Sequence, residues 1–139
     1  IILNHVGGLV LDGPYESIRE EVLTNWRDRI KELSECPNVV VKLGGIGMPR
    51  TGFDWHLRQR PIGSEELAVQ MGPLLSYCIE QFGPERGMFE SNFPVDKVSY
   101  SYNILYNAFK IFSKDYSPTE RALMFRDNAI DIYSVDESL

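Results

Sequence analysis

The amino-acid sequence predicts an α/β fold in which parallel strands alternate with helices. Three short runs rich in β-branched and other apolar residues occupy residues 1–5, 39–43 and 88–92. Each run is followed by a stretch in which apolar residues recur every three or four positions. Alternating strands and helices form parallel sheets with right-handed crossovers. Ligands of such sheets bind at the carboxyl ends of the strands, so we expect functional residues there.

The composition fits one globular domain. The chain has 139 residues, of which 43% are hydrophobic and 24% charged, and a formal net charge of -6. No apolar run approaches the ~20 residues of a membrane-spanning helix, and no signal peptide is recognisable. The acidic balance argues against nucleic acid as a partner. Cys36 and Cys78 have no C-x-x-C spacing, which favours free thiols and a cytoplasmic location.

The first unit begins with a strand over Ile1–His5, which the turn-forming pair Gly7-Gly8 follows. A helix is expected over Glu16–Glu35, because its apolar residues form a single face. These residues are Ile18, Val22, Trp26, Ile30 and Leu33. The strand has no lead-in and no Met precedes it, which suggests the C-terminal part of a larger protein.

The second unit begins with the nearly continuous apolar strand Val39–Leu43, a pattern typical of a parallel strand that is covered on both faces. A long loop over 44–63 follows it. Ser64 is expected to cap a helix that ends at Phe82, where Gly83-Pro84 follows. Pro73 should kink or split this helix.

The third unit begins with the strand Met88–Asn92 and continues with a helix over Ser101–Ser113. A last helix begins at Ser117-Pro118-Thr119-Glu120. This segment is a capping box with proline at the first helical position, which is a specific signal for a helix start.

Polar side chains lie at the predicted carboxyl ends of all three strands. His5 could be a metal ligand, a general acid or base, or a hydrogen-bonded core histidine. Lys42 could face a carboxylate or carbonyl oxygen of a substrate, or it could form a structural ion pair with Glu90. Asn92 can donate and accept hydrogen bonds. Side-chain alternation along the strands would direct His5, Lys42 and Asn92 into one pocket.

Two loops add further candidates. Asp96, four residues after Asn92, could act as a base or could cap the next helix, and the capping role is favoured. The loop 44–63 is long for a connection between strand and helix. It carries Arg50, His56 and Arg58 together with Arg60, which could recruit an anionic substrate as a lid or could be solvated side chains of an ordinary loop.

Several segments together resemble the amidohydrolase-related family, also called amidohydrolase 2, of predicted metal-dependent TIM-barrel hydrolases. The resemblance covers essentially the whole chain and rests on Leu3–Gly8, Pro37–Gly45, Phe82–Arg86, Met88–Asp96 and the tail residues Glu120, Arg121, Phe125, Asn128, Ala129 and Tyr133. Each motif alone is weak, but together and in this order they are specific.

This resemblance implies that residues 1–139 form the C-terminal part of a (β/α)8 barrel, with about three βα units and a C-terminal helix. The N-terminal half of the barrel, with a His-x-His pair on its first strand, would lie outside the chain. His5 matches a histidine of the sixth strand that contacts metal-bound water or substrate, so it is a tentative ligand of a divalent metal such as Zn or Mn. Asn92 stands where many members have a catalytic Asp; an amide cannot act as a base.

The function that this resemblance implies is hydrolysis at a carbonyl carbon of a small anionic molecule, such as a lactone or a related carboxylic acid. His5, Asn92 and Asp96 are the expected catalytic residues, and Lys42, Arg50, His56 and Arg58 the expected substrate-binding residues. One alternative is a non-catalytic or metal-free binding module on the same barrel, and another is a lyase, either a decarboxylase or a hydratase. A third is a self-contained α/β domain.

Overall fold

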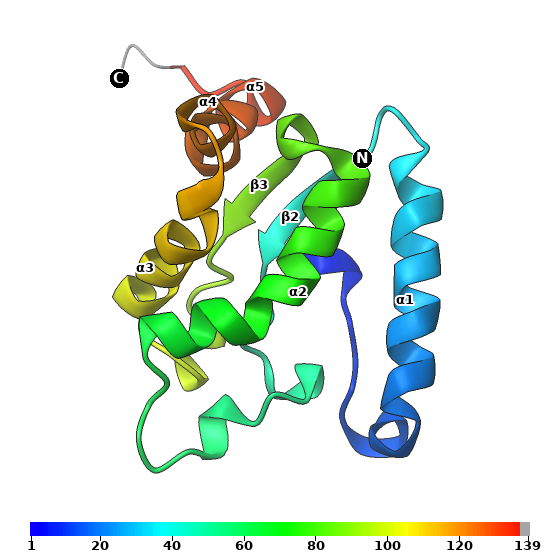
Figure 1. Cartoon of the computed structure of the whole chain (residues 1–139), viewed down its shortest axis with the longest axis vertical. Helices are drawn as coiled ribbons and strands as arrows, with labels where there is room; N and C mark the ends of the chain where they lie inside the picture. Colours follow the sequence, from blue (N-terminus) through cyan, green and yellow to red (C-terminus); the bar gives the residue numbers. More distant parts are fainter. Residues whose placement is uncertain (137–139) are drawn as a thin grey trace.

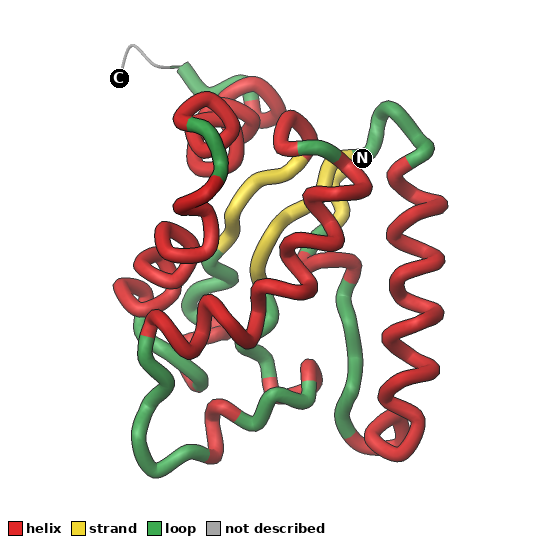
Figure 2. Tube along the Cα trace, in the orientation of Figure 1, coloured by secondary structure: helices red, strands yellow, loops and turns green. Residues whose placement is uncertain are grey.

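A three-stranded parallel sheet lies at the centre of the computed structural model, which describes residues 1–136. The middle strand β2 (Val40–Gly44) pairs in parallel with β1 (Ile2–Leu3) on one side and with β3 (Gly87–Glu90) on the other. The predicted α/β class with parallel strands is therefore confirmed. Within residues 1–136, the outer edges of β1 and β3 pair with no further strand (Figure 2).

Helices cover one face of this sheet. The bounds of the five α-helices are α1 Arg19–Ser34, α2 Ser64–Phe82, α3 Tyr102–Phe112, α4 Pro118–Ala122 and α5 Asn128–Tyr133. Figure 1 shows α2 crossing in front of the strands, with α1 to one side of it and α3 to α5 to the other. None of the helices in residues 1–136 has the length and apolar character that a membrane crossing requires.

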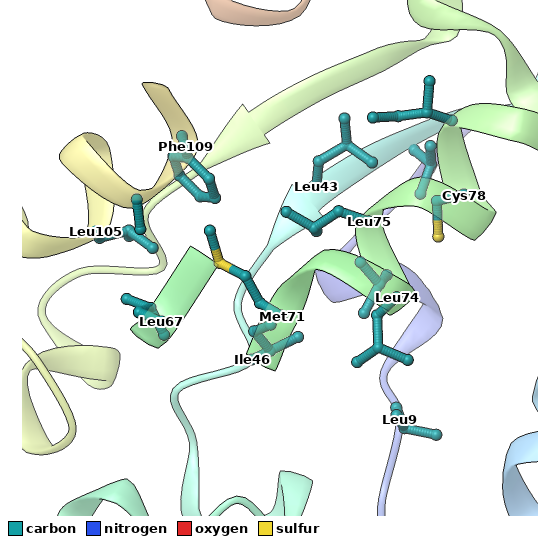
Figure 3. Close-up of a cluster of buried hydrophobic side chains, with 14 of the residues drawn as sticks. Leu9, Leu43, Ile46, Leu67, Met71, Leu74, Leu75, Cys78, Leu105 and Phe109 are labelled. Atoms are coloured by element: carbon teal, nitrogen blue, oxygen red, sulfur yellow. The ribbon is translucent and has the colours of Figure 1, made fainter. Parts of the chain in front are cut away.

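The hydrophobic core fills the space between the sheet and α2. Val41 and Leu43 of β2 are fully buried. Figure 3 shows Leu43 in one cluster with Met71 and Leu75 of α2 and Phe109 of α3, all of which are fully buried. This packing buries the apolar face that periodicity predicts for α2. On the opposite face, Val40 and Lys42 are only half-buried, so the expected cover on both faces of β2 is absent within residues 1–136.

Two strands end earlier than the sequence predicts. β1 stops at Leu3, because His5 and Val6 take the left-handed conformation with φ of 55° and 46°. β3 stops at Glu90, and Asn92 has a φ of 51° in the loop that follows. Asparagine tolerates this conformation better than most residues. His5 and Asn92 therefore do not alternate with the strand residues, and the prediction from strand alternation is wrong for these two positions.

The helices match the sequence more closely. α1 begins at Arg19, after a 3-10 turn over Gly13–Ile18. α2 begins at Ser64, but the Ser64 side chain makes no capping hydrogen bond, and the helix continues through Pro73 as one element that bends in Figure 1. The capping box at the start of α4 is confirmed, because the Ser117 side chain accepts a hydrogen bond from the Glu120 N–H and the Glu120 side chain accepts one from the Ser117 N–H.

Candidate active site

The carboxylate of Glu90 joins the carboxyl ends of all three strands. Its Oε1 accepts a hydrogen bond from the backbone N–H of His5 at 2.8 Å and lies 2.6 Å from the imidazole Nδ1 of the same residue. Its Oε2 lies 3.7 Å from Nζ of Lys42. The side chains of His5, Lys42 and Glu90 are 26%, 23% and 11% exposed, so the imidazole, the ammonium and the carboxylate contact one another in a partly buried position.

This contact fixes the tautomer of His5. An ionised carboxylate only accepts hydrogen bonds, so the proton of a neutral imidazole lies on Nδ1 and the lone pair on Nε2. No group in residues 1–136 forms a hydrogen bond with Nε2. The His5 ring therefore presents Nε2 to any molecule that enters this end of the sheet.

Glycines make room for this arrangement. A Cβ atom on Gly45 would collide with the His5 imidazole, and one on Gly44 would collide with the backbone and side chain of Glu90. Gly45 also has a φ of 67°, which other residues adopt at a cost. The segment that follows β2 is thus shaped to receive His5 and Glu90.

The structure supports the ion-pair interpretation of Lys42. Nζ of Lys42 faces Glu90 and lies 5.7 Å from the centre of the Tyr133 ring, within the range of a cation–π contact. Lys42 therefore balances the negative charge of Glu90 near the carboxyl end of β2. Its predicted contact with a substrate remains a prediction.

A second polar cluster centres on Asp96, which is completely buried. Its Oδ1 accepts a hydrogen bond from Nδ2 of Asn92 at 2.7 Å, and its Oδ2 accepts from the Gly47 N–H and the Tyr100 hydroxyl, both at 2.9 Å. The favoured prediction that Asp96 caps the next helix is wrong: Ser101 caps α3, because the Ser101 hydroxyl accepts from the Ile104 N–H. Its full burial also removes Asp96 from direct contact with a substrate.

The two clusters are electrostatically linked. Burial raises the pKa of the Asp96 carboxyl, while the hydrogen bonds from Gly47, Asn92 and Tyr100 and the nearby His5 oppose that rise. His5 therefore lies near enough to Asp96 to favour its ionised form. We define the site as His5, Lys42 and Glu90 together with Asn92 and its support Asp96.

The predicted basic loop lies apart from these contacts. Nη2 of Arg58 is paired with Oε1 of Glu66 at 2.9 Å, and the ring of Trp55 donates to Gln70, so the loop is fastened to α2. Among residues 1–136, no hydrogen bond or ion pair joins the side chain of Arg50 or of His56 to the two clusters. Direct contacts therefore do not link Arg50, His56 or Arg58 to His5, and their substrate-binding role stays a prediction.

An open groove of about 740 Å³ is lined by Tyr100 of the second cluster and by Phe93, which follows Asn92 in the chain. Its wall includes Phe93, Pro94, Tyr100, Tyr102 and Pro61, so it is largely apolar. It gives an uncharged part of a ligand a surface next to the second cluster.

Sequence reasoning named Glu90 as a partner of Lys42 but missed its contact with His5, and it missed Tyr100 entirely. The spacing of glycines in Gly44-Gly45-Ile46-Gly47 was an available signal, since Gly47 packs against Tyr100 and Asp96 as Gly45 packs against His5. Such a density of glycine directly after a strand marks a close approach of other groups.

The described residues do not build a metal site by themselves. No group of three or more His, Cys, Asp or Glu side chains in residues 1–136 is arranged to hold a metal ion. Nε2 of His5 could supply one ligand, with Glu90 as the carboxylate that orients the ring. The expected Zn or Mn ion would need its remaining ligands from outside this part of the chain, so no reaction step can be derived through it here.

Comparisons with known proteins agree with this architecture. The model of the family described as "Amidohydrolase" matches residues 1–135. An uncharacterized protein, y4mH, of Sinorhizobium fredii is 38% identical over 97% of the chain and 39% of its own length. An L-fucono-1,5-lactonase of Burkholderia multivorans is 29% identical over 99% of the chain and 44% of its own length. The chain thus spans less than half the length of these curated relatives.

Solved structures show the same likeness. An amidohydrolase of Burkholderia multivorans with bound HEPES has a TM-score of 0.78 and 28% identity, and covers 97% of this chain with 44% of its own. A structure of the same description with bound Zn has a TM-score of 0.78 and 26% identity over the same shares. An amidohydrolase 2 of Bifidobacterium longum, 21% identical with a TM-score of 0.56, supports the fold alone.

Proposed function

Since this chain belongs to the amidohydrolase family, we propose that it is part of a hydrolase that adds water to the carbonyl carbon of a small anionic substrate, a lactone or a related carboxylic acid. The relationship to an L-fucono-1,5-lactonase supports the lactone as substrate class. We further propose that residues 1–139 form the C-terminal part of its barrel, and that the free thiols of Cys36 and Cys78 reflect a cytoplasmic protein.

The observation that carries this proposal is the orientation of His5 by Glu90 at the carboxyl ends of the strands. A neutral imidazole with Nδ1 on a carboxylate has Nε2 ready to accept a proton from water or to polarise a substrate group once protonated. The negative charge of Glu90 stabilises the imidazolium that forms. Nζ of Lys42 adds a positive charge on the other side of Glu90, 3.7 Å from its Oε2.

Asn92 is the second group that we place next to the substrate. Its carboxamide is neutral and cannot take a proton from water, so its part is to hold water or substrate by hydrogen bonds. The sequence also offered Asp96 as a base. Asp96 is fully buried, and we give it the role of holding Asn92 in place through a hydrogen bond.

Arg50 and His56 are proposed to attract the anionic group of the substrate. Arg50 is exposed and His56 half-buried on the long loop, whereas Arg58 is engaged by Glu66 and would have to leave it. Arginine forks suit carboxylates well, and even without contact a basic loop in an acidic chain concentrates anions.

A divalent metal, Zn or Mn, gives His5 an alternative role in the complete protein: Nε2 of His5 would then be the ligand that this chain contributes, and it would not take up a proton. The chemistry that such an ion would supply is that of a Lewis acid towards a carbonyl oxygen and towards water. A related amidohydrolase structure contains Zn.

The test is a hydrolysis assay of the complete protein with L-fucono-1,5-lactone and a panel of other sugar-acid lactones. His5→Ala should lower kcat/KM by at least ~100-fold, because it removes a group that transfers or directs a proton. Glu32→Gln, in an exposed pair with Arg29, is the matched control and should leave the rate unchanged.

A rate that survives His5→Ala would remove His5 from the mechanism. The neutral Asn92 at the end of β3 favours a second candidate, a barrel that binds a ligand without turning it over. Tight binding of the lactones or their acids without hydrolysis would support that binding module. Release of carbon dioxide or water from carboxylic acids would point to a lyase instead.

A further inference from the structure

We propose that Asp96 is a positioning residue that fixes the carboxamide of Asn92, so that the oxygen Oδ1 of Asn92 faces the site and selects a hydrogen-bond donor there. The donor is a substrate hydroxyl or a water molecule. This inference rests on the proposed function only in that it takes the site to be the place where substrate binds.

The hydrogen bonds of Asp96 define which end of the amide turns toward it. Oδ2 is occupied by two donors, the Gly47 N–H and the Tyr100 hydroxyl. Oδ1 is the acceptor for Asn92, whose Nδ2 donates to it at 2.7 Å. The opposite end of the amide, Oδ1 of Asn92, is thereby directed away from Asp96.

The backbone holds Asn92 in the same orientation. Its φ of 51° places it in the left-handed region, and its carbonyl oxygen accepts a hydrogen bond from the Asp96 N–H at 3.2 Å. Asn92 and Asp96 are therefore joined by two hydrogen bonds, one between their backbones and one between their side chains. Asn92 is partly exposed whereas Asp96 is completely buried, so the free end of the amide points outward from the protein interior.

The choice of a carboxylate at position 96 is unexplained by stability alone. Burial of an ionised carboxylate is costly, and here burial raises the pKa of Asp96. An asparagine at position 96 could accept from Gly47 and Tyr100 with its single oxygen at a lower desolvation cost. What the carboxylate adds is a second acceptor, and this second acceptor is the atom that orients Asn92.

The pair of Asn92 and Asp96 lies close to the cluster of His5, Lys42 and Glu90. Gly45 packs against the His5 ring and Gly47 packs against Asp96 and Tyr100, so one short glycine-rich segment lies between both clusters. His5 also lies close enough to lower the pKa of Asp96. An acceptor at Asn92 and Nε2 of His5 are therefore presented at the same end of the sheet, as a site for a hydroxyl-bearing or hydrated substrate requires.

The decisive experiment uses two variants of the complete protein. The first reverses the orientation of the Asn92 carboxamide, and the second restores a hydrogen-bond acceptor at position 92. In Asp96→Asn, the new amide keeps its oxygen on Gly47 and Tyr100 and offers NH2 to Asn92, which must then turn its own oxygen inward. We expect kcat/KM for L-fucono-1,5-lactone, or for the best lactone of the panel, to fall roughly 10- to 100-fold with the unfolding midpoint nearly retained.

The double variant Asn92→Asp/Asp96→Asn again places an acceptor at position 92 and keeps a hydrogen bond between the two side chains. It should recover kcat/KM to within about fivefold of the wild type if acceptor polarity is what matters. The panel also distinguishes the two possible donors. If the donor is a hydroxyl group of the substrate, Asp96→Asn should no longer lower kcat/KM for a lactone without that hydroxyl. If the donor is water, Asp96→Asn should lower kcat/KM for that lactone as well.

A readout without turnover separates this inference from the proposed function. In protein labelled with ¹⁵N asparagine, the Nδ2 protons of Asn92 should be protected from exchange in the wild type and lose that protection in Asp96→Ala. Unprotected protons in the folded wild type, or a folded Asp96→Asn variant with unchanged kcat/KM, would overturn the inference. The wild type could also hydrolyse no lactone and still protect the Nδ2 protons of Asn92. That result would refute the proposed lactone hydrolysis and would support the orientation of Asn92.

Discussion

At the scale of single residues, Glu90 is the polar group of the site that contacts residues from the other two strand ends. Its carboxylate accepts hydrogen bonds from the backbone N–H and the ring of His5 and forms an ion pair with the ammonium of Lys42. When one partner of such a half-buried contact is removed, the remaining polar groups are left without a partner, which costs free energy. Glu90 thereby couples the stability of the strand ends to the orientation of His5.

Glu90→Gln should destabilise the protein by about 1–3 kcal/mol, because it leaves the ammonium of Lys42 without a counter-ion. Urea unfolding measures the change. The double variant Lys42→Met/Glu90→Gln should recover part of the loss. Glu66→Gln in the exposed pair with Arg58 is the control and should have a smaller effect. Equal losses at Glu66 and Glu90 would contradict this assignment.

The two cysteines differ in reactivity. Burial raises the pKa of Cys78 from 9.0 to about 12, whereas Cys36 is exposed. In the unfolded chain Cys78 ionises near pH 9, but in the folded protein it stays protonated, so unfolding becomes easier as pH rises from 9 to 12. Below pH 9 the stability from this group is fully present.

Urea unfolding at about pH 8 and about pH 10 should therefore show a loss of about 1.4 kcal/mol for each pH unit above the unfolded pKa of the thiol. Cys78→Ser, which has no thiol to ionise, should show a smaller slope. Tyr100, whose pKa burial also raises, contributes to both proteins alike. Identical slopes in the two proteins would refute this origin of the pH dependence.

At the scale of elements, the ends of helices and strands are joined by a few side chains. Arg86 donates to the carbonyl oxygens of Ser34 at the end of α1, Phe82 at the end of α2, and Cys36 and Val39 before β2. These carbonyls include helix-terminal groups that have no partner within their own helix. Arg86 thus holds two helices and a strand in one arrangement.

Arg86→Ala should lower the free energy of unfolding by about 2–3 kcal/mol, because several carbonyls, most of them partly buried, lose a charged donor at once. Arg86→Lys should restore less than half of it, since an ammonium cannot replace the planar fork of a guanidinium. Chemical denaturation measures both. Arg29→Ala on the exposed face of α1 provides the control, and a similar loss there would contradict the role of Arg86.

Sequence patterns predicted these elements unequally. Helical periodicity and the capping box of Ser117 and Glu120 depend on residues close in the chain, and they placed α1, α2, α3 and the start of α4 to within a few residues. The ends of β1 and β3 depend on left-handed turns at His5 and Asn92, which apolar patterns do not encode. The strand predictions therefore ran on by one or two residues.

At the scale of the whole molecule, the sheet is open at both sides. β1 and β3 each have an outer edge without a partner strand in residues 1–136, and one face of β2 stays half-buried. Unpaired edges and a half-covered face are sites of association with other strands. The chain also spans less than half the length of its curated relatives.

Residues 1–139 produced alone should self-associate at micromolar concentration, as sedimentation velocity or light scattering would show. Production together with the preceding part of a longer relative should suppress this association, because added strands cover the edges. A monomer that unfolds in one cooperative transition would instead establish a self-contained α/β domain, the third interpretation of the sequence.

The sequence by itself determined the α/β class, the order of the elements, the amidohydrolase family and the polar residues His5, Lys42 and Asn92 near the strand ends. Tertiary structure alone decided the partners: Glu90 for His5, and Asp96 with Gly47 and Tyr100 behind Asn92. The reason is physical. Periodicity reports which residues seek burial, whereas a hydrogen-bond partner depends on turns, glycine contacts and loop packing that bring together residues up to 85 positions apart.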